Sequence, residues 1–498
     1  MTKPSTLPKK LTLSSRHAGR KVGQTLKVAR TGLGFQLSKK LYIRLCDLVP
    51  FLGQPDPTDP IANVETDDQN IRIEFSSGAK KNLQLSAWEK SQKQVTVIKD
   101  IGQLLTANGP SKTDVDALGL LHDAAVVLEG RTIKWVGLEK DLPSANVPRD
   151  SNTVSAQGRL VTPGLVDCHS HPVFAGERSL EFSQRATGLS YQEIAANGGG
   201  IQASTRPTRA ATTEELVESS CRRLENSLAS GTTTTEAKSG YDLTAEGEIR
   251  LLLCSLMIDA VSQIDVSPTL LGAHVVPSEY ANDRAAYIAE VVEKMIPNAS
   301  DLADAVDVYC DQGAFSLEES RLILEAAAKH GFLLRAHVGQ FKDIGAAEMV
   351  AEMGGTSCDH LEQISAQGIQ AMAQNDVVAV MLPGACVQLG MTPPPVSKLR
   401  DAKVSMAIAT DHNPGTSMGA TLPIQMWLAC CHYNMTVAEA WLGVTRNAAK
   451  ALGRNTIGRI APGFQADLVF WGAEHYAEIP YRYDANLTTR VIKRGLVL

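Results

Sequence analysis

The chain has 498 residues, 44% of them hydrophobic and 20% charged, which allows more than one globular domain. A net charge of -6 gives no overall attraction to nucleic acid, and no apolar run reaches the length of a membrane-spanning helix. Nine cysteines without a CxxC pair argue against a disulfide framework or a structural zinc knuckle. We therefore expect a cytoplasmic protein that contacts neither nucleic acid nor membrane.

The amino-terminal segment differs from the rest of the chain in charge. The first 46 residues hold eleven Lys or Arg and no Asp or Glu. Such a composition is typical of a transit peptide, a nucleic-acid-binding arm, a disordered tail or an upstream extension without a folded role. No apolar region with a small-residue cleavage site follows, which argues against secretion. We expect residues 1–94 to be a basic, irregular extension and assign them no role.

Two separated segments have the sequence pattern of a small β domain. Short apolar or alternating runs with glycine turns begin at Val95: VTVIKDIGQLLT, DAAVVLEGRTIKWVG and NTVSAQGRLVTPG. Strand patterns return near the carboxyl end, in GRIAPGFQADLVFWG and TRVIKRGLVL. We expect residues 95–160 and 466–498 to form one composite β-sandwich, with a second domain, residues 161–465, inserted between its halves.

The inserted segment alternates strand and helix patterns. Eight strand candidates are GLVDCHSH, GTTTTEAKSG, SPTLLGAH, DAVDVYCD, FLLRAHV, TSCDH, VVAVMLP and VSMAIATDH. Most are separated by amphipathic helical runs, and TTEE and SLEE place an N-cap residue ahead of Glu. This alternation predicts an α/β fold, a parallel (β/α)8 TIM barrel. A doubly wound open sheet is the alternative, weakened because no GxGxxG follows an early strand.

Polar side chains gather where the predicted strands end. His169 and His171 end the first strand and point to one face because they are two residues apart. In a barrel these strand ends open into the active-site mouth. Three further histidines and one aspartate end other strands: His274, His337, His360 and Asp411. Neutral imidazoles with a carboxylate suit a borderline divalent metal. We expect one Zn or Fe ion, held by His169, His171, His337 and Asp411.

This constellation resembles that of the amidohydrolase superfamily, and the finer match is to the imidazolonepropionases. The resemblance spans Val95 to Leu498 and is carried by PGLVDCHSHPVFAGER, SYQEIAANGGGI, EAKSGY, LGAHVVP, CDHLE, ATDHNPGTS and GFQADLVFWGAEHYAEIPY. GGGI and DHNPGTS are more specific than the metal motif. The resemblance implies hydrolysis of 4-imidazolone-5-propanoate to N-formimidoyl-L-glutamate in histidine degradation, by a homodimer.

The resemblance also implies roles for individual residues. A substrate-binding role falls on Arg178, Tyr191, Tyr241, His274, Gln340, Asn413, Gly415 and Thr416, and a catalytic role on His274, His360, Asp411 and Gln340. An arginine fork and a tyrosine hydroxyl suit the propanoate carboxylate. In this scheme His274 polarises the ring carbonyl, His360 orients the nucleophile and Asp411 passes a proton to the leaving nitrogen. Structural alternatives stay open: an ion pair for Arg178, packing for the tyrosines, a turn for Asn413 and a core position for His360.

Some positions depart from the family pattern. Gln340 stands where some members have Glu, and since an amide is not a base, that task falls to His360 or Asp411. His412 follows Asp411 where an aromatic residue is common. Lys238 ends the second strand, whereas binuclear relatives use a lysine of the fourth; DAVDVYCD has none, so we expect a single metal. The competing functions are another cyclic-amide hydrolase, a deaminase, which Gln340 disfavours, and a scaffold without catalysis.

Overall fold

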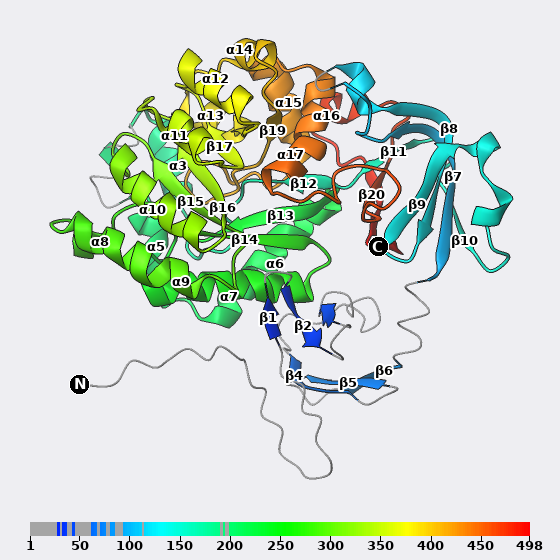
Figure 1. Ribbon diagram of the computed structural model, residues 1–498, viewed down its shortest axis with the longest axis horizontal. Coiled ribbons are helices and arrows are strands. Elements are labelled where there is room, and N and C mark those ends of the chain that lie inside the picture. Colours follow the sequence, from blue (N-terminus) through cyan, green and yellow to red (C-terminus); the bar gives the residue numbers. More distant parts are fainter. Residues whose placement is uncertain are drawn as a thin grey trace, which may run out of the picture.

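The computed structural model describes residues 93–498, except 112–113, 190–192 and 195–198, and six short strands between residues 27 and 84. Its largest part is a barrel of eight parallel strands in sequential order (Figure 1). The strands are β12 (Leu165–Asp167), β13 (Thr232–Lys238), β14 (Asp265–Ala273), β15 (Ala305–Cys310), β16 (Leu333–Val338), β17 (Ser357–His360), β18 (Val378–Met381) and β19 (Met406–Ile408). Each of the eight predicted strands is confirmed, and the TIM barrel replaces the open-sheet alternative.

The barrel is joined between its first and last strands by the residues that follow them. Ser170 forms a parallel bridge with His412. The Asp411 N–H donates to the His169 carbonyl at 2.9 Å, and the His171 N–H donates to the His412 carbonyl at 2.9 Å. Backbone pairing at this seam therefore brings the HxH segment directly beside Asp411.

Helices surround the barrel. They are α6 (Thr213–Ala229), α7 (Ala245–Val261), α8 (Arg284–Glu290), α10 (Leu317–Lys329), α11 (Ala346–Glu352), α12 (Ala366–Gln374), α13 (Pro383–Leu389), α14 (Val396–Asp401), α15 (Leu422–His432), α16 (Val437–Gly443) and α17 (Arg446–Ala451). Both predicted helix starts are capping boxes, Thr212 with Glu215 and Ser316 with Glu319. No helix in the described part of the chain is long and apolar enough to cross a membrane.

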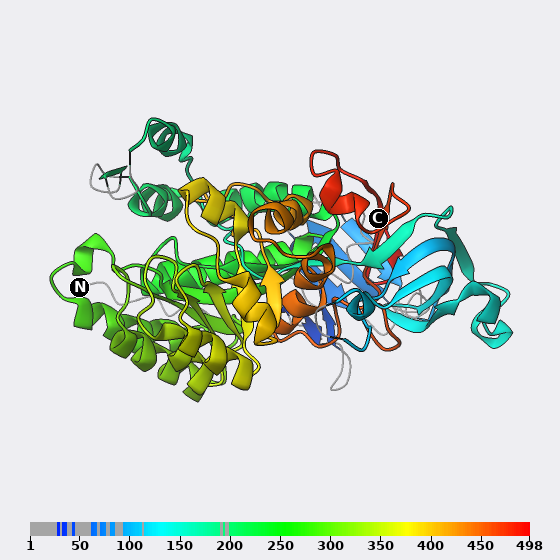
Figure 2. The same ribbon diagram turned by 90° about the horizontal axis from the view of Figure 1, so that it is seen from above.

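Two further helices follow β12, α3 (Ser179–Ala186) and α5 (Gln202–Ala210). In Figure 2 this teal segment stands out from one side of the barrel. It carries Arg178 at the start of α3.

A second sheet is built from both flanks of the barrel segment. Its strands are β7 (Val95–Leu105), β8 (Leu120–Glu129), β9 (Thr132–Leu138), β10 (Asn152–Ser155), β11 (Leu160–Pro163), β20 (Leu468–Trp471), β21 (Thr488–Lys493) and β22 (Leu496–Val497). The two flanks meet where β11 pairs antiparallel with β20, Val161 opposite Phe470. In Figure 1 the cyan strands and the red end of the chain lie together at this sheet. A separate apolar cluster fills it, including Ile98, Val126 and Leu468.

The amino-terminal extension contains more regular structure than we expected. The structure places two three-stranded antiparallel sheets there: β1 (Lys27–Ala29), β2 (Gly32–Gln36) and β3 (Tyr42–Arg44), then β4 (Ile61–Thr66), β5 (Asn70–Phe75) and β6 (Lys80–Gln84). Alternation of apolar and charged residues in NIRIEF accounts for a strand at β5. The other residues of the 1–92 segment lie outside the described part.

The barrel interior is charged near its carboxyl-terminal end. Glu236, Lys238, Asp307, Arg335 and Asp359 are each 0% exposed, where TIM barrels commonly place Val, Ile or Leu. Alternation along β13 puts Glu236 and Lys238 on the same face. Buried charges persist only when they are paired, so this layer must be held by specific contacts. It lies directly beneath the predicted histidine site.

Candidate metal-dependent active site

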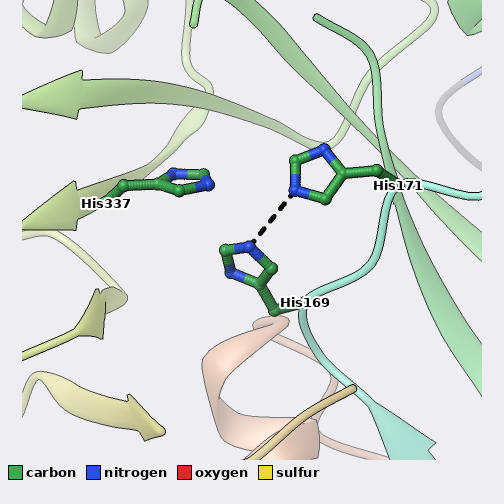
Figure 3. A group of neighbouring side chains, drawn as sticks. All are labelled: His169, His171 and His337. Atoms are coloured by element: carbon green, nitrogen blue, oxygen red, sulfur yellow. Dashed lines mark hydrogen bonds between the residues drawn. The ribbon is translucent and has the colours of Figure 1, made fainter. Parts of the chain in front are cut away.

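Three predicted metal ligands form a compact, buried group. One ligand atom from each of His169, His171 and His337 lies within 4.8 Å of the other two (Figure 3). The Nε2 atoms of His169 and His171 face each other at 3.3 Å. These rings come from opposite sides of the barrel, from the segment after β12 and from β16.

Asp411 is the fourth predicted ligand and adjoins this group. Its Oδ1 lies 3.4 Å from the His169 Nε2 and 3.5 Å from the His171 Nε2. Asp411 has a φ of 49°, a left-handed backbone that disfavours a side chain with a Cβ. Strain of this kind is held in place by surrounding structure and clusters at functional sites.

Two carboxylates fix which ring nitrogen carries hydrogen. The Nδ1 of His169 lies 2.6 Å from Asp359 Oδ2, and the Nδ1 of His337 lies 2.9 Å from Asp307 Oδ1. A carboxylate accepts, so Nδ1 donates and Nε2 keeps its lone pair. A cation satisfies lone pairs that otherwise face each other across 3.3 Å. The residues present therefore fit a divalent metal, and the histidine group indicates a bound metal ion.

The surroundings of His169 and His171 favour the neutral imidazole, which is the form that binds metal. Burial and the nearby Lys238 charge lower the pKa of His169 well below its ordinary value. Burial and His274 do the same to the pKa of His171. Burial raises the pKa of Asp411, although His360 and His337 oppose this.

A cavity of about 830 Å³ opens over the group. Predicted site residues line it: His171, Arg178, Tyr241, His274, His337, Gln340, His360, Asp411, Asn413, Gly415 and Thr416. His169 is fully buried beneath it. Tyr191, the remaining predicted residue, lies outside the described residues. Segments from most of the strand ends thus converge on one space, as a TIM-barrel active site requires.

Arg178 lies in the cavity wall and forms an ion pair, the alternative that we kept for it, with Glu181, which we had not singled out. Its Nε and Nη2 donate to the two carboxylate oxygens of Glu181, at 3.0 and 2.7 Å. Glu181 also accepts from the Gly200 N–H of the GGGI stretch at 3.3 Å. The guanidinium packs so closely on Gly415 that a Cβ there would lie 2.5 Å from Nη1. Gly415 is therefore required for the position of Arg178.

His274 has a defined hydrogen-bonding state. Its Nδ1 lies 3.0 Å from the Gly240 carbonyl, which accepts, so Nδ1 carries the hydrogen. Burial, with the neighbouring His337, lowers the pKa of His274 to about 3. The neutral ring then offers only its other nitrogen, a lone pair, to a ligand. Polarising a carbonyl as we expected would require the protonated ring, which burial disfavours.

Gln340 and His360 have neighbours that the sequence did not reveal. The Tyr309 hydroxyl donates to Gln340 Oε1 at 2.6 Å, and Tyr309 also lines the cavity. Glu362 lies 3.9 Å from the Nδ1 of His360. Burial lowers the pKa of His360, but Glu362 and Asp411 outweigh it and raise that pKa. His360 has a φ of 80°, so two strained residues flank the site.

The DHNPGTS stretch is a turn that supports Asp411, the fourth predicted ligand. Asn413 Nδ2 donates to the Asp411 carbonyl at 2.6 Å, and Asn413 Oδ1 accepts from the N–H groups of Gly415 and Thr416 at 2.8 Å each. Thr416 Oγ1 lies 3.4 Å from Asp411 Oδ2. The turn that we kept as an alternative for Asn413 is therefore present, at the wall of the cavity.

Sequence reasoning missed the carboxylates that hold the ligands. Asp307 and Asp359 meet histidines that are distant in sequence, whereas Glu181 meets Arg178 three residues earlier, at the N-cap of its own helix α3. A usable signal existed for one of them. Asp307 is a charged residue inside a strand that is otherwise largely apolar, and such a residue needs a buried partner.

Comparisons with known proteins agree with this geometry. Residues 160–497 match the family model described as "Amidohydrolase family". The chain is 44% identical over 383 residues to the imidazolonepropionase of Paracoccus denitrificans, covering 76% of this chain and 95% of that relative. It is 45% identical over 381 residues to the imidazolonepropionase of Chromobacterium violaceum, covering 76% of this chain and 92% of that one.

Solved structures support the fold. The E. coli guanine deaminase aligns with a TM-score of 0.61 at 15% identity, covering 81% of this chain and 99% of that chain. The A. niger ochratoxinase aligns with a TM-score of 0.58 at 19% identity, covering 82% and 96%. At these identities the likeness concerns architecture alone. The identities to the curated relatives, over most of their length, show that the chain belongs to the imidazolonepropionase family of amidohydrolases.

Proposed function

We propose that this chain hydrolyses 4-imidazolone-5-propanoate to N-formimidoyl-L-glutamate, with one Zn or Fe ion held by His169, His171, His337 and Asp411. The observation that carries the proposal is the convergence of these four side chains at the floor of one cavity. Family membership supplies the substrate. In the reaction the oxygen of water bonds to the ring carbonyl carbon, the bond from that carbon to the ring nitrogen breaks, and the nitrogen takes up a proton.

The protein's own groups hold the reactants in place. When bound, a divalent metal supplies a Lewis acid that lowers the pKa of water and so provides a nucleophile near neutral pH. Asp307 and Asp359 keep the two histidine rings in the ligand tautomer. His360 and Asp411 line the cavity beside the metal group, and we assign to them the holding and transfer of protons.

Arg178 is the proposed partner of the propanoate carboxylate. Its guanidinium lies in the cavity wall and is oriented by Glu181 and by contact with Gly415. Tyr241 lines the same cavity 3% exposed and adds a hydroxyl. Charge-assisted hydrogen bonds from arginine suit a carboxylate. The propanoate end of the substrate is therefore assigned to Arg178, away from the metal.

His274 takes a different part from the one its sequence suggested. With Nδ1 donating to Gly240, the neutral ring accepts a hydrogen bond, and the ring N–H of an imidazolone is a matching donor. We therefore assign His274 to recognition of the substrate ring. Gln340, an amide, transfers no proton, which disfavours a deaminase that must protonate a departing amine.

The deciding experiment is an assay of the purified full chain on freshly generated 4-imidazolone-5-propanoate, with metal analysis of the same sample. We expect the chain to hydrolyse this substrate and to contain about one divalent ion. The rate of hydrolysis should rise in proportion to the metal content of the sample. Guanine and other cyclic amides serve as competing substrates. Faster turnover of one of these, or full activity after removal of all metal, would overturn the proposal.

We further propose a cytoplasmic homodimer that binds neither nucleic acid nor membrane. The eight cysteines that the structure describes carry no disulfide, in keeping with a reducing compartment. The net charge of -6 gives no general attraction to polyanions. Light scattering of the purified chain tests the dimer. Localisation of a tagged full-length chain tests the cytoplasmic location.

A further inference from the structure

The ammonium group of Lys238 lies among three carboxylates inside the barrel. Its Nζ is bonded to Asp307 Oδ2, lies 3.1 Å from Glu236 Oε2 and lies 3.5 Å from Asp359 Oδ2. The side chains of Lys238, Glu236, Asp307 and Asp359 are each 0% exposed. A lysine without solvent and with three anionic neighbours acts as a fixed internal cation.

Two of these carboxylates are the ones that hold metal-site histidines. Asp307 uses Oδ2 for Lys238 and Oδ1 for the His337 Nδ1. Asp359 places the same oxygen, Oδ2, 2.6 Å from the His169 Nδ1 and 3.5 Å from Lys238. One ammonium therefore joins the supports of two ligands that come from β16 and from the segment after β12.

We propose that Lys238 is a positioning residue: its ammonium clamps Asp307 and Asp359 together and thereby presets His337 and His169 for metal. The proposal rests on the metal site of the proposed function. It also explains why this lysine does not bridge two metals. A carboxylated Lys238 would place a negative charge among Glu236, Asp307 and Asp359, where the three carboxylates require a cation.

Arg335 is a second buried cation in this layer and offers a matched control. It pairs with Glu236 and donates to Thr269 Oγ1 at 3.0 Å, and the charge of Asp359 acts on it only at longer range. Its side chain is 1% exposed, so its removal, like that of Lys238, takes a cation away from a buried carboxylate; Glu236 then keeps its contact with Lys238. Of these two cations, Lys238 is the one that contacts the carboxylates bonded to metal-site histidines.

The test measures Zn²⁺ affinity of the metal-free full chain by competition with a fluorescent chelator. Lys238→Met should weaken Zn²⁺ binding by about 10- to 100-fold, the usual effect of losing the support of metal ligands. Lys238→Arg keeps the charge and should regain much of the affinity. Arg335→Met should stay within about 3-fold of wild type even where it lowers Tm as much as Lys238→Met does.

The outcomes separate the inference from the proposed function. Wild-type chain that binds no Zn²⁺ overturns the metal site itself. If wild type and Lys238→Met bind Zn²⁺ with equal affinity, only the clamp is overturned. The same holds if Arg335→Met loses as much Zn²⁺ affinity as Lys238→Met does. Where Lys238→Met does not fold, a double-mutant cycle of Asp307→Asn and Asp359→Asn decides. A clamp predicts that the double variant loses less Zn²⁺ affinity than the product of the two single fold-losses. Independent supports predict a loss equal to that product.

Discussion

Glu181 binds the guanidinium of Arg178 side-on, through Nε at 3.0 Å and Nη2 at 2.7 Å. Glu181 is 7% exposed, so this ion pair is withdrawn from solvent and has a fixed geometry. The arginine we assign to the substrate carboxylate is therefore oriented before any ligand arrives, and its partner comes from α3.

We expect Glu181→Gln to raise KM about 10-fold while kcat changes little, because the lost bond acts on ground-state binding through Arg178. Steady-state kinetics on 4-imidazolone-5-propanoate measure this. Glu218→Gln is the control, since Glu218 also pairs with an arginine, Arg222, but on the exposed surface of α6. Equal effects of the two variants would contradict the positioning role.

Mutations should affect metal binding and binding of the substrate carboxylate separately. We expect His337→Ala to lose both metal and turnover, because it removes one of three histidine donors. We expect Arg178→Ala to retain metal and raise KM by roughly 10- to 100-fold, because it loses a charge-assisted contact to substrate. Metal content and kinetics are measured on the same preparations. Unaltered KM in Arg178→Ala would refute the assigned carboxylate role.

Acid should destabilise the metal-free chain partly through His412. Burial, with Arg223 nearby, lowers the pKa of His412 to about 4. Between pH 6.5 and 4 the unfolded chain takes up a proton that the folded chain does not, so stability falls as pH drops through 6.5. Well inside this window, His412 lowers the free energy of unfolding by about 1.4 kcal/mol for each unit by which the pH falls. His412→Phe should remove this contribution.

Urea unfolding of the metal-free chain at pH 7.5 and 5.5 measures this difference. His412 lies 6.2 Å from the Phe174 ring, centroid to centroid, so phenylalanine keeps an aromatic neighbour there. His330→Gln, on the exposed end of α10, serves as the control. An unchanged pH slope in His412→Phe would show that another group carries the acid sensitivity.

Residues 1–90 should be dispensable for turnover. All described residues that line the cavity lie at or beyond His171. We expect a chain without residues 1–90 to keep kcat/KM within about 2-fold of the full chain, since no transition-state contact is removed. Both chains are assayed at equal metal content. A large loss would show that the extension contributes to the site.

The barrel and its metal group were predictable because both depend on local patterns. The strand TTTTEAK and its neighbours are bounded by capped helices, and a parallel barrel collects all strand ends at one mouth. Hence His337 and the HxH pair could be placed together before their distances were known. The seam between His169 and Asp411 follows from the same rule.

The supporting contacts were not predictable in this way. Asp359 meets His169 across 190 residues of chain, and nothing local to CDHLE indicates which histidine it will bind. The state of His274 depends on the carbonyl of Gly240, whose φ of 99° permits an approach that a Cβ would block at 2.9 Å. Such details arise from tertiary packing, so the sequence could not indicate which hydrogen-bonding role His274 takes.

The pairing of β11 with β20 affects how the protein is made. Leu160–Pro163 leave the ribosome about 300 residues ahead of Leu468–Trp471, their neighbours in the sheet. During that interval the apolar edge of β11 has no partner, while the barrel strands are still being added. The sheet therefore cannot be completed until Leu468–Trp471 have been made, and a nascent chain interrupted before them exposes an edge that invites aggregation.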